Sequence, residues 1–459
     1  MGATTVIKFG TDGWRSRMDV DFNSSNVSRI AVAVSKFLKE NHAAGRVVVG
    51  YDTRRNSSEF ARVAGSVLAN NGFRVTMTVR PTPTPVVAYS VVSTNSIGAV
   101  QITASHNPPV YNGFKFIPDY GGPAFPEITS KLEKYLPEKA PAVNSKDLEG
   151  FDPRAEYLMF LKKNIDLSEI KGMNVVVDPM FGAGYGYVSE ILSDAGARVT
   201  EIHGLPDPAF GGLNPEPNEE NTRELARKVV DGGFELGLAN DGDADRFGAI
   251  DAKGRHYPSN KLVLVLGDYL FRVKGIRKKI ARSISVTKCV DTLCRKFGVE
   301  PAVTPVGFKY LAKELMNGAV MGVEESGGIG FGWSTPEKDG IMSCSLLCEA
   351  LSKQGLSLEE VWARVSEEYG FGDYLQFNLP ASESIKRRLE TIKSAPPERF
   401  ADSKIAKVVT LDGLKFELDD ESWILMRPSG TEPLIRIYIE TAGTKRSAEL
   451  REAATKLLS

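Results

Sequence analysis

The first residue that could carry out chemistry is Ser105, in the run Thr103-Ala104-Ser105-His106-Asn107-Pro108. A serine hydroxyl is a poor nucleophile unless neighbouring groups activate it. The run separates an apolar stretch, 97–102, from a polar one, 112–115. Because Asn107 precedes a proline, it is pushed out of the helical region and the loop is held extended. An ordinary turn with a solvated serine also fits this run, so its meaning depends on the other motifs.

Three aspartates, Asp241, Asp243 and Asp245, follow an apolar strand pattern at intervals of two residues. In an extended segment such residues point to the same side. Converging carboxylates repel one another unless a cation or an arginine compensates, which argues against a solvated acidic turn. Three hard oxygen donors suit Mg²⁺, which keeps positions for water or a phosphate oxygen. An EF-hand is not supported, because Arg246 and Ala252 stand where that calcium loop needs glycine and glutamate.

A second anion-binding pattern is the run Arg427-Pro428-Ser429-Gly430-Thr431-Glu432-Pro433, followed by Arg436. It combines two guanidinium groups with two hydroxyls around a glycine, where backbone amides can face an anion. That is the donor set for a phosphate dianion. The sequence contains no GxxxxGK[ST] run, so a P-loop NTPase is not supported.

Three weaker patterns accompany these runs. The glycine-bounded loop 322–328 carries Glu324, Glu325 and Ser326, which suit the vicinal hydroxyls of a sugar, although acidic glycine-rich turns are common. The run 182–187 imitates a dinucleotide fingerprint but has Tyr187 in place of the third glycine. Lys288 ends a predicted strand, where a lysine is usually solvated.

The elements that must position these residues repeat along the chain. A pattern of strand, helix, glycine and strand occurs at 46–79, at 174–202 and, more weakly, at 281–303, with the last strands predicted at 281–287 and 299–303. A short strand and then a glycine-punctuated loop are also expected over 7–15, before an amphipathic helix at 27–38. Such units close as right-handed βαβ crossovers, which predicts three similar α/β domains with mixed, largely parallel sheets. The last region mixes short strands with a final helix and is predicted to be α+β. We expect boundaries at 1–150, 151–255, 256–370 and 371–459.

Composition narrows the class of protein. At 459 residues the chain is too long for one hydrophobic core. A net charge of −1 gives no reason to expect nucleic acid or an anionic membrane as partner, and no apolar run approaches the roughly 20 residues of a membrane span. The four cysteines match no zinc pair or disulfide framework, so free thiols in a reducing cytoplasm are expected. The start of the chain lacks the regions of a signal peptide.

Four runs in this order, 103–108, 241–246, 324–327 and 427–433, closely resemble the signature loops of the α-D-phosphohexomutase superfamily, the phosphoglucomutase and phosphomannomutase enzymes. The resemblance covers nearly the whole chain. It implies three similar α/β domains and a C-terminal α+β domain around a central active-site cleft. It also implies a cytoplasmic enzyme that binds a hexose phosphate, as a monomer or a homodimer.

The resemblance assigns roles residue by residue. Ser105 would be a phosphoserine, and Asp241, Asp243 and Asp245 would hold one Mg²⁺ with the seryl phosphate as a further ligand. Arg246 would lie beside the reacting phosphoryl group, while Glu324, Ser326 and Lys338 would contact the sugar. The second phosphate would be held by Arg427, Ser429, Gly430, Thr431 and Arg436. The site would also be lined by Arg15, His106, Lys115 and Lys288, with Lys288 as general acid or base.

The implied reaction is a mutase cycle between hexose 1-phosphate and hexose 6-phosphate, with glucose 1,6-bisphosphate as activator and intermediate. The runs 307–310 and 336–340 are similar to those of glucose-type members, and Phe308 and Gly328 replace histidines of dual-specificity phosphomannomutases. We therefore expect glucose as the sugar, with mannose and glucosamine as alternatives. A metal-dependent sugar phosphatase and a non-catalytic sugar-phosphate-binding relative are less favoured, because nucleophile, metal ligands and phosphate grip are all intact.

Overall fold

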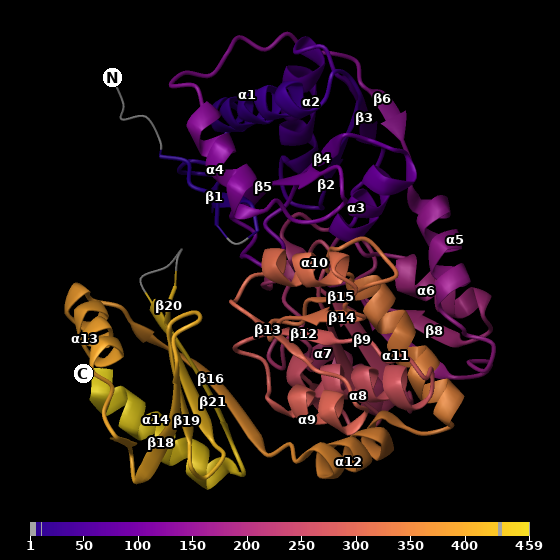
Figure 1. Cartoon of the computed structure of the whole chain (residues 1–459). Helices are drawn as coiled ribbons and strands as arrows, with labels where there is room; N and C mark the ends of the chain where they lie inside the picture. The colour runs from indigo at the N-terminus through magenta and orange to yellow at the C-terminus, as the bar shows by residue number, and fades with distance from the viewer. Residues whose placement is uncertain (1–5, 11, 430–433, 459) are drawn as a thin grey trace.

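The computed structural model describes residues 6–10, 12–429 and 434–458. The chain forms four units, each built on one sheet. The first unit lies above the second and third, and the fourth stands to one side of the third (Figure 1). The prediction of three similar α/β units followed by an α+β unit is confirmed. Among the described residues, no helix combines the length and apolar character that a membrane crossing requires.

The first unit has a six-stranded sheet in the order β1-β5-β4-β2-β3-β6. Its strands β4, β2, β3 and β6 are parallel, whereas β5 runs antiparallel to β4 and to β1. Its elements are β1 (Trp14–Arg17), α1 (Ser24–Asn41), β2 (Arg46–Tyr51), α2 (Ser57–Asn70), β3 (Arg74–Thr78), α3 (Thr84–Ser93), β4 (Gly98–Ile102), β5 (Tyr111–Pro118), α4 (Pro126–Tyr135) and β6 (Glu149–Phe151).

The order expected over 7–15, a short strand and then a loop, is wrong, because residues 7–10 form no strand and β1 begins where the loop was expected to end. The backbone amide of Phe9 donates to the carboxylate of Glu133 at 2.8 Å instead of to a neighbouring strand. Pairing begins only at Trp14, opposite Phe114 of β5. Ile7 and Phe9 are nevertheless buried in the hydrophobic core of this unit, which explains their apolar character.

The second unit repeats the arrangement with the order β11-β10-β9-β7-β8, in which β9, β7 and β8 are parallel and β10 is antiparallel to β9. Strand β11 pairs with β10, so this sheet extends to Tyr257. Its elements are α5 (Arg154–Asn164), β7 (Asn174–Asp178), α6 (Tyr187–Asp194), β8 (Arg198–Glu201), the 3₁₀ turn η1 (Phe210–Gly212), α7 (Arg223–Gly232), β9 (Leu236–Asn240), β10 (Phe247–Asp251) and β11 (His256–Tyr257).

The third unit has the order β13-β12-β14-β15, with β15 antiparallel. Its first two strands are shorter than predicted. The amide of Val286 donates to the carbonyl of Ser283 in a turn that ends the first strand, and the amide of Val299 donates to the carbonyl of Cys294 before the second strand begins. Its elements are α8 (Ser259–Arg272), β12 (Ile280–Ser283), α9 (Cys289–Lys296), β13 (Ala302–Thr304), α10 (Phe308–Met316), β14 (Met321–Val323), β15 (Ile329–Phe331), α11 (Gly340–Gln354) and α12 (Leu358–Tyr369).

The second and third units share one hydrophobic core, which the repeat pattern did not predict. Helix α11 follows the third sheet in sequence but packs against α6, β9 and β10 of the second unit. A single buried cluster therefore runs from Tyr157 of α5 to Tyr369 of α12. We infer that these two units move as one body.

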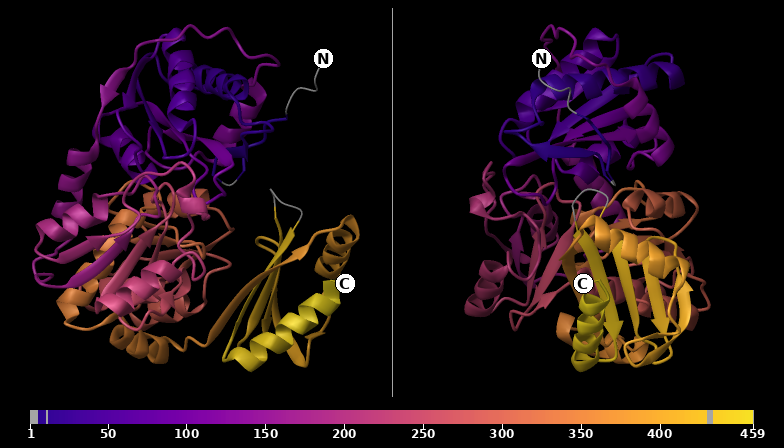
Figure 2. Two further views of the ribbon diagram at one scale, coloured as in Figure 1. Left: turned by 180° about the vertical axis from the view of Figure 1, so that it is seen from behind. Right: turned by 90° about the vertical axis from the view of Figure 1, so that its left-hand side faces the viewer.

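The fourth unit is an antiparallel sheet in the order β16-β21-β20-β19-β18-β17. Its two helices cover the face that is turned away from the third unit, as Figure 2 shows. Its elements are β16 (Asp373–Pro380), α13 (Glu383–Ser394), β17 (Arg399–Phe400), β18 (Ser403–Val409), β19 (Leu414–Leu418), β20 (Trp423–Pro428), β21 (Leu434–Thr441) and α14 (Thr444–Leu458).

Lys415 of β19 is buried where the fourth unit meets the third. Its Nζ donates to the carbonyl of Ile284 at 3.2 Å and lies 3.6 Å from the ring centre of Trp423. Burial, followed by the nearby charge of Arg282, lowers the pKa of Lys415 to about 7.

The lowered pKa of Lys415 leads to a prediction about how the free energy of unfolding depends on pH. Above pH 7 the folded chain releases the proton of Lys415, whereas the unfolded chain keeps it to about pH 10.4. The unfolded chain then binds more protons, so the free energy of unfolding rises with pH over this window, by up to about 1.4 kcal/mol per pH unit. Urea unfolding at several pH values should show a smaller rise for Lys415→Met than for the wild type. The same rise in both proteins would contradict the assignment, and Lys407→Met, at an exposed lysine of β18, is the control.

Candidate active site

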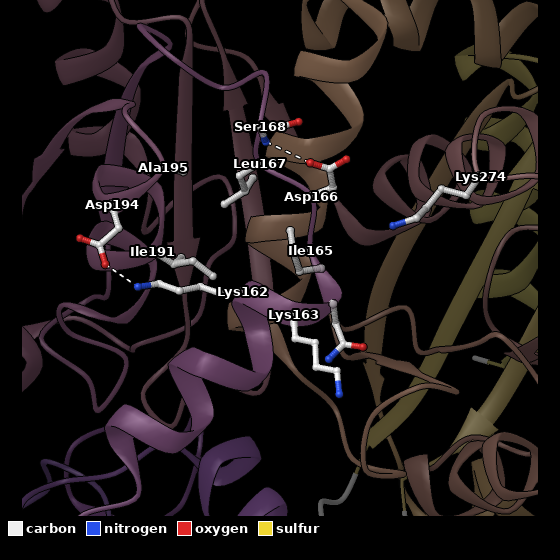
Figure 3. A pocket seen from close by; sticks show the side chains of 11 residues that line it. Lys162, Lys163, Ile165, Asp166, Leu167, Ser168, Ile191, Asp194, Ala195 and Lys274 are labelled. Carbon is white, nitrogen blue, oxygen red and sulfur yellow. Dashed lines mark hydrogen bonds and ion pairs between the residues drawn. The ribbon is translucent and has the colours of Figure 1, made fainter.

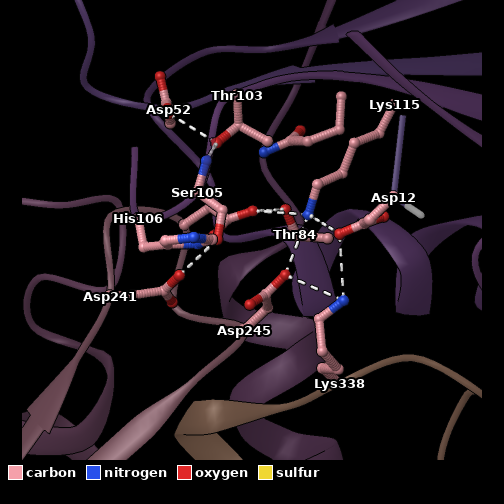
Figure 4. A network of polar contacts seen from close by, with 12 residues as sticks. Asp12, Asp52, Thr84, Thr103, Ser105, His106, Lys115, Asp241, Asp245 and Lys338 are labelled. Carbon is pink, nitrogen blue, oxygen red and sulfur yellow. Dashed lines mark hydrogen bonds and ion pairs between the residues drawn. The ribbon is translucent and has the colours of Figure 1, made fainter. Parts of the chain in front are cut away.

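Ser105 lies in the loop after β4 and is 1% exposed. Its backbone has φ of 51°, a left-handed conformation that is uncommon for a residue other than glycine. Its hydroxyl donates to Asp241 Oδ2 at 2.6 Å and lies 3.3 Å from His106 Nδ1 (Figure 4). The predicted nucleophile of the first unit and the predicted acidic loop of the second unit are therefore in direct contact.

The three aspartates lie in the turn between β9 and β10, not in the extended segment that the sequence analysis assumed. Ala244 has φ of 55°, and the side-chain amide of Asn240 closes the turn by donating to the carbonyl of Arg246 at 2.9 Å. The turn still brings one oxygen each from Asp241, Asp243 and Asp245 to within 4.8 Å of one another. The predicted convergence therefore holds, although its geometric reason is different.

Neighbouring units hold this turn in place. The backbone amide of Thr84, at the start of α3, donates to the carbonyl of Asp243 at 3.0 Å. The amide of Gly340, at the start of α11, donates to the carbonyl of Ala244 at 3.1 Å. A side chain at Gly340 would lie 2.3 Å from the carbonyl oxygen of Arg246, so this close approach requires glycine.

The electrostatics of the turn favour a bound cation. Burial, followed by Asp245 and Asp243, raises the pKa of Asp241 well above its usual range. The Oδ1 atoms of Asp243 and Asp245 are buried without a hydrogen-bond partner. Buried acceptors without partners cost free energy, and a cation would satisfy them. An all-oxygen donor set of this kind fits a hard divalent metal ion.

Two buried lysines face the same carboxylates. Lys115 Nζ lies 2.9 Å from Asp12, 2.9 Å from Asp243 and 3.0 Å from Asp245. Lys338 Nζ lies 3.1 Å from Asp12 and 3.3 Å from Asp245. Burial alone would lower the pKa of Lys115, but the three carboxylates raise it above its usual range, so this amine stays charged. Sequence reasoning did not select Asp12, although its glycine-flanked position in Gly10-Thr11-Asp12-Gly13 is a signal that could have found it.

Arg246, Arg15 and His106 lie around the serine loop. The backbone amide of Arg246 donates to Asp241 Oδ1 at 3.0 Å and its guanidinium pairs with Glu216 at 3.1 Å, while its buried Nε has no hydrogen-bond partner. Arg15 donates to the side chain of Asn107 at 2.8 Å. Burial, followed by Arg246 and other nearby cations, holds the pKa of His106 well below its usual value, so its imidazole is neutral at pH 7.

The loop at 324–328 lies next to the acidic turn. The amide of Phe247 donates to the carbonyl of Gly327 at 3.2 Å, and Arg246 and Gly328 form a β-bridge. Burial raises the pKa of Glu324 to about 7. Ser326 is partly exposed in the same turn. A side chain at Gly328 would lie 2.4 Å from the stem of Lys338, so the glycine leaves room for that lysine.

The predicted phosphate loop is at the end of the fourth unit's sheet. Arg427 of β20 pairs across the ladder with Arg436 of β21, which places two like charges opposite each other. Arg427 Nε donates to Asp412 at 2.8 Å, and the amide of Ser429 donates to the carbonyl of Leu434 at 2.8 Å. Gly430 and Thr431, which were also predicted for this loop, lie outside the described residues.

Lys288 makes hydrogen bonds with the fourth unit. Its Nζ donates to the carbonyl of Glu421, and its backbone amide donates to the carboxylate of Glu440 at 2.9 Å. Both partners belong to the fourth unit. In this arrangement Lys288 therefore joins the third and fourth units, whereas Lys115 and Lys338 face the acidic turn.

A separate hollow of about 680 Å³ lies between the C-terminal ends of α5 and α6 (Figure 3). Lys162, Lys163, Lys274, Asp166 and Asp194 contribute to its lining. Lys162 pairs with Asp194 at 2.6 Å, and Lys274 pairs with the buried Glu349 at 2.6 Å. None of the residues of the Ser105 cluster lines this hollow, so its size does not make it part of the site.

Comparison with known proteins agrees with this arrangement. The phosphoglucomutase/phosphomannomutase family models match along the chain: α/β/α domain I at 6–142, domain II at 155–254, domain III at 258–369 and the C-terminal domain at 385–457. A "Probable phosphoglucosamine mutase" of Pyrococcus abyssi is 32% identical over 98% of this chain and 97% of its own. A "Phosphoglucomutase/phosphomannomutase" of Thermococcus kodakarensis is 31% identical over 98% of each chain.

A solved structure from Thermus thermophilus, described as a "putative phosphomannomutase", has a TM-score of 0.89 and 32% identity over 99% of both chains. Four sheets in this order, with a serine facing three carboxylates where the first two units meet, define the α-D-phosphohexomutase superfamily, a class of isomerases of carbohydrate metabolism. Within this class, the chain belongs to the phosphoglucomutase/phosphomannomutase family.

Proposed function

We propose that this protein interconverts hexose 1-phosphate and hexose 6-phosphate through a phosphoserine at Ser105 and a hexose 1,6-bisphosphate intermediate. The observation that carries the proposal is the buried Ser105 hydroxyl, which donates to Asp241 at 2.6 Å within a cluster of carboxylates and cations. Phosphoryl transfer needs a positioned nucleophile and compensated charge more than it needs covalent chemistry from the protein. This cluster offers both.

Asp241, Asp243 and Asp245 are the proposed ligands of one Mg²⁺, with the oxygen on Ser105 as a further ligand. The unpartnered Oδ1 atoms of Asp243 and Asp245 support this assignment. When bound, Mg²⁺ would neutralise charge that develops on the transferring phosphoryl group. Lys115 and Arg246 would add fixed positive charge beside it, because Lys115 is buried, Arg246 is largely buried, and both are charged. His106, held neutral 3.3 Å from the Ser105 hydroxyl, is able to accept a proton there.

Removal of the metal gives a direct prediction. Treatment with a chelator should abolish isomerisation, and added Mg²⁺ should restore it. Mg²⁺ should also raise the melting temperature in a concentration-dependent way, because it binds the folded chain at three buried carboxylates. Differential scanning calorimetry with and without Mg²⁺ measures this shift, and Ca²⁺ tests ion selectivity. Full turnover in excess chelator would refute the assignment.

The other end of the substrate would be held by the third and fourth units. Glu324, Ser326 and Lys338 would bind sugar hydroxyls, and Arg427, Ser429, Gly430, Thr431 and Arg436 would grip the phosphate that is not reacting. Two arginines opposite each other in a sheet repel unless an anion or acid compensates. Asp412 pairs with Arg427 at 2.8 Å, and the positive charge of the two arginines would attract a phosphate dianion. Closure of the fourth unit would then exclude water from the phosphoryl group.

We propose glucose as the preferred sugar, with glucosamine and mannose as alternatives that use the same mechanism. Position 328 is a glycine and not the histidine of dual-specificity phosphomannomutases. A side chain at this position would lie 2.4 Å from the side chain of Lys338, so the packing here favours glycine. The Pyrococcus abyssi relative is named as a probable phosphoglucosamine mutase, which supports glucosamine as an alternative.

Each sugar 1-phosphate should be assayed with Mg²⁺ and catalytic glucose 1,6-bisphosphate, while free phosphate is counted. Fast isomerisation of glucose 1-phosphate supports the proposal, and preference for another sugar would correct the specificity alone. Release of phosphate without isomerisation would overturn the mutase mechanism in favour of a phosphatase.

A further inference from the structure

Arg54, in the turn between β2 and α2, is a buried guanidinium that the mechanism above does not use. It is 3% exposed. A buried arginine is costly unless its donors are satisfied. The groups that accept its hydrogen bonds therefore indicate its structural role.

The guanidinium of Arg54 is directed at the backbone of the serine loop. Its Nη2 donates to the carbonyl oxygens of Ser105, at 2.5 Å, and Asn107, at 2.7 Å. Its Nη1 donates to the carbonyl oxygens of Pro108, at 2.8 Å, and Tyr111, at 3.1 Å. One planar side chain thus holds four carbonyl groups within seven residues of the chain.

Asp52 accepts hydrogen bonds from both the guanidinium of Arg54 and the side chain of Thr103 in the serine loop. Its Oδ2 accepts from Arg54 Nε at 3.0 Å and from the Thr103 hydroxyl at 2.7 Å. The Thr103 hydroxyl in turn accepts the backbone amide of Ser105 at 2.9 Å. The amide and the carbonyl of Ser105 are therefore both tied to the Asp52–Arg54 pair. A residue with φ of 51° keeps this conformation only where its surroundings over-determine it.

The same arginine links the serine loop to the acidic turn. Its guanidinium lies over the ring of Phe210 of the second unit, 4.9 Å from the ring centre. A side chain at Gly242 would lie 2.7 Å from the carbonyl oxygen of Ser105 and 3.4 Å from the Phe210 ring. The carbonyl that Arg54 holds thus packs against the backbone between Asp241 and Asp243.

We propose that Arg54, oriented by Asp52, is a positioning residue that places the Ser105 hydroxyl against the acidic turn for phosphoryl transfer. This inference rests on the proposed function, because it assigns Ser105 as the nucleophile. Lysine has a single nitrogen and cannot reproduce the planar fork that reaches four carbonyls. A misplacement of about 1 Å at a reacting atom lowers a rate by roughly 100-fold.

The test compares Arg54→Lys and Arg54→Met with the matched variant Arg29→Lys. Arg29 is buried in the same unit and donates to the carbonyl of Pro137. The rate of Ser105 phosphorylation by glucose 1,6-bisphosphate, the KM for the sugar phosphate, and amide hydrogen exchange across 103–112 are measured on full-length protein. We expect Arg54→Lys to lower the phosphorylation rate by roughly 100-fold and Arg54→Met to lower it further, with KM changed less than about threefold. Amide exchange in the serine loop should rise in both variants and not in Arg29→Lys.

Equal phosphorylation rates in Arg54→Lys and the wild type would overturn the proposal, and so would unchanged exchange in the serine loop. An equal loss of phosphorylation rate in Arg29→Lys, with the same rise in amide exchange, would show a general effect of removing a buried guanidinium, which also contradicts a positioning role. If the wild type itself takes no phosphate on Ser105, the proposed function fails. The exchange comparison then decides by itself whether Arg54 holds the loop.

Discussion

Replacing Ser105 by alanine is expected to lower kcat by roughly 10⁴-fold or more, because loss of the group that forms the covalent intermediate removes the whole cycle. The change deletes one buried hydroxyl that bonds to Asp241 at 2.6 Å. Asp241 keeps its bond to the backbone amide of Arg246, so the fold should survive. Binding of the sugar phosphate, measured by calorimetry, should change little, since the grip on the substrate lies on other units.

The control for this variant is Ser90→Ala, which removes a buried hydroxyl of α3 that donates only within its helix. It should keep nearly full activity. Turnover by Ser105→Ala above a tenth of the wild-type value would exclude Ser105 as the phosphoryl carrier, and an equal loss in Ser90→Ala would point to damage of the first unit.

Replacing Lys115 by methionine is the prediction with the next largest effect. Lys115 Nζ contacts three buried carboxylates at about 3 Å, from Asp12, Asp243 and Asp245. Removing one partner of a buried ion pair leaves uncompensated charge and costs about 3–5 kcal/mol. We expect a loss of that size in the metal-free free energy of unfolding, together with a loss of roughly 10³-fold in kcat, because the transition state loses a fixed charge.

The loss of stability should depend on pH and metal in a defined direction. Burial raises and Lys115 lowers the pKa values of Asp12 and Asp243, so these pKa values should rise when Lys115 is removed. The folded variant then binds more protons than the folded wild type, and the deficit shrinks as pH falls. Mg²⁺ should also offset part of it. Urea unfolding at pH 5 and pH 8, with and without Mg²⁺, measures both effects, and Lys131→Met, at an exposed lysine of α4, is the control. A deficit that is independent of pH and of Mg²⁺ would contradict the role of Lys115.

The sequence predicts a large part of this architecture because much of its information is local. The first two predicted repeats, 46–79 and 174–202, match the structure to within one residue at each end, since β2 begins at Arg46 and β3 ends at Thr78, and β7 begins at Asn174 and β8 ends at Glu201. The third repeat is less regular, and there the strand bounds were wrong. The shared core of the second and third units could not be predicted, because helix α11 packs on a sheet distant in sequence.

For the site, sequence reasoning selected the loops that carry several polar groups in one run, and it did not select single residues that contact several units. Asp12 gains its meaning only beside Lys115 and Lys338, which are distant in sequence. Arg54 works through backbone carbonyls, which leave no trace in residue types. Lys288 was selected from its position after a strand, and in this arrangement its contacts go to Glu421 and Glu440 of the fourth unit; its role as general acid or base stays a prediction.

The central claim is that one phosphoryl group passes through Ser105. The most direct measurement incubates the protein with radiolabelled glucose 1,6-bisphosphate and Mg²⁺, maps the labelled peptide by mass spectrometry, and then adds unlabelled glucose 1-phosphate. The account predicts close to one labelled phosphate per chain on Ser105, none in Ser105→Ala, and transfer of that label to the sugar at a rate no slower than turnover. Isomerisation without label on Ser105, or a labelled serine that never passes its phosphate to the sugar, would contradict it.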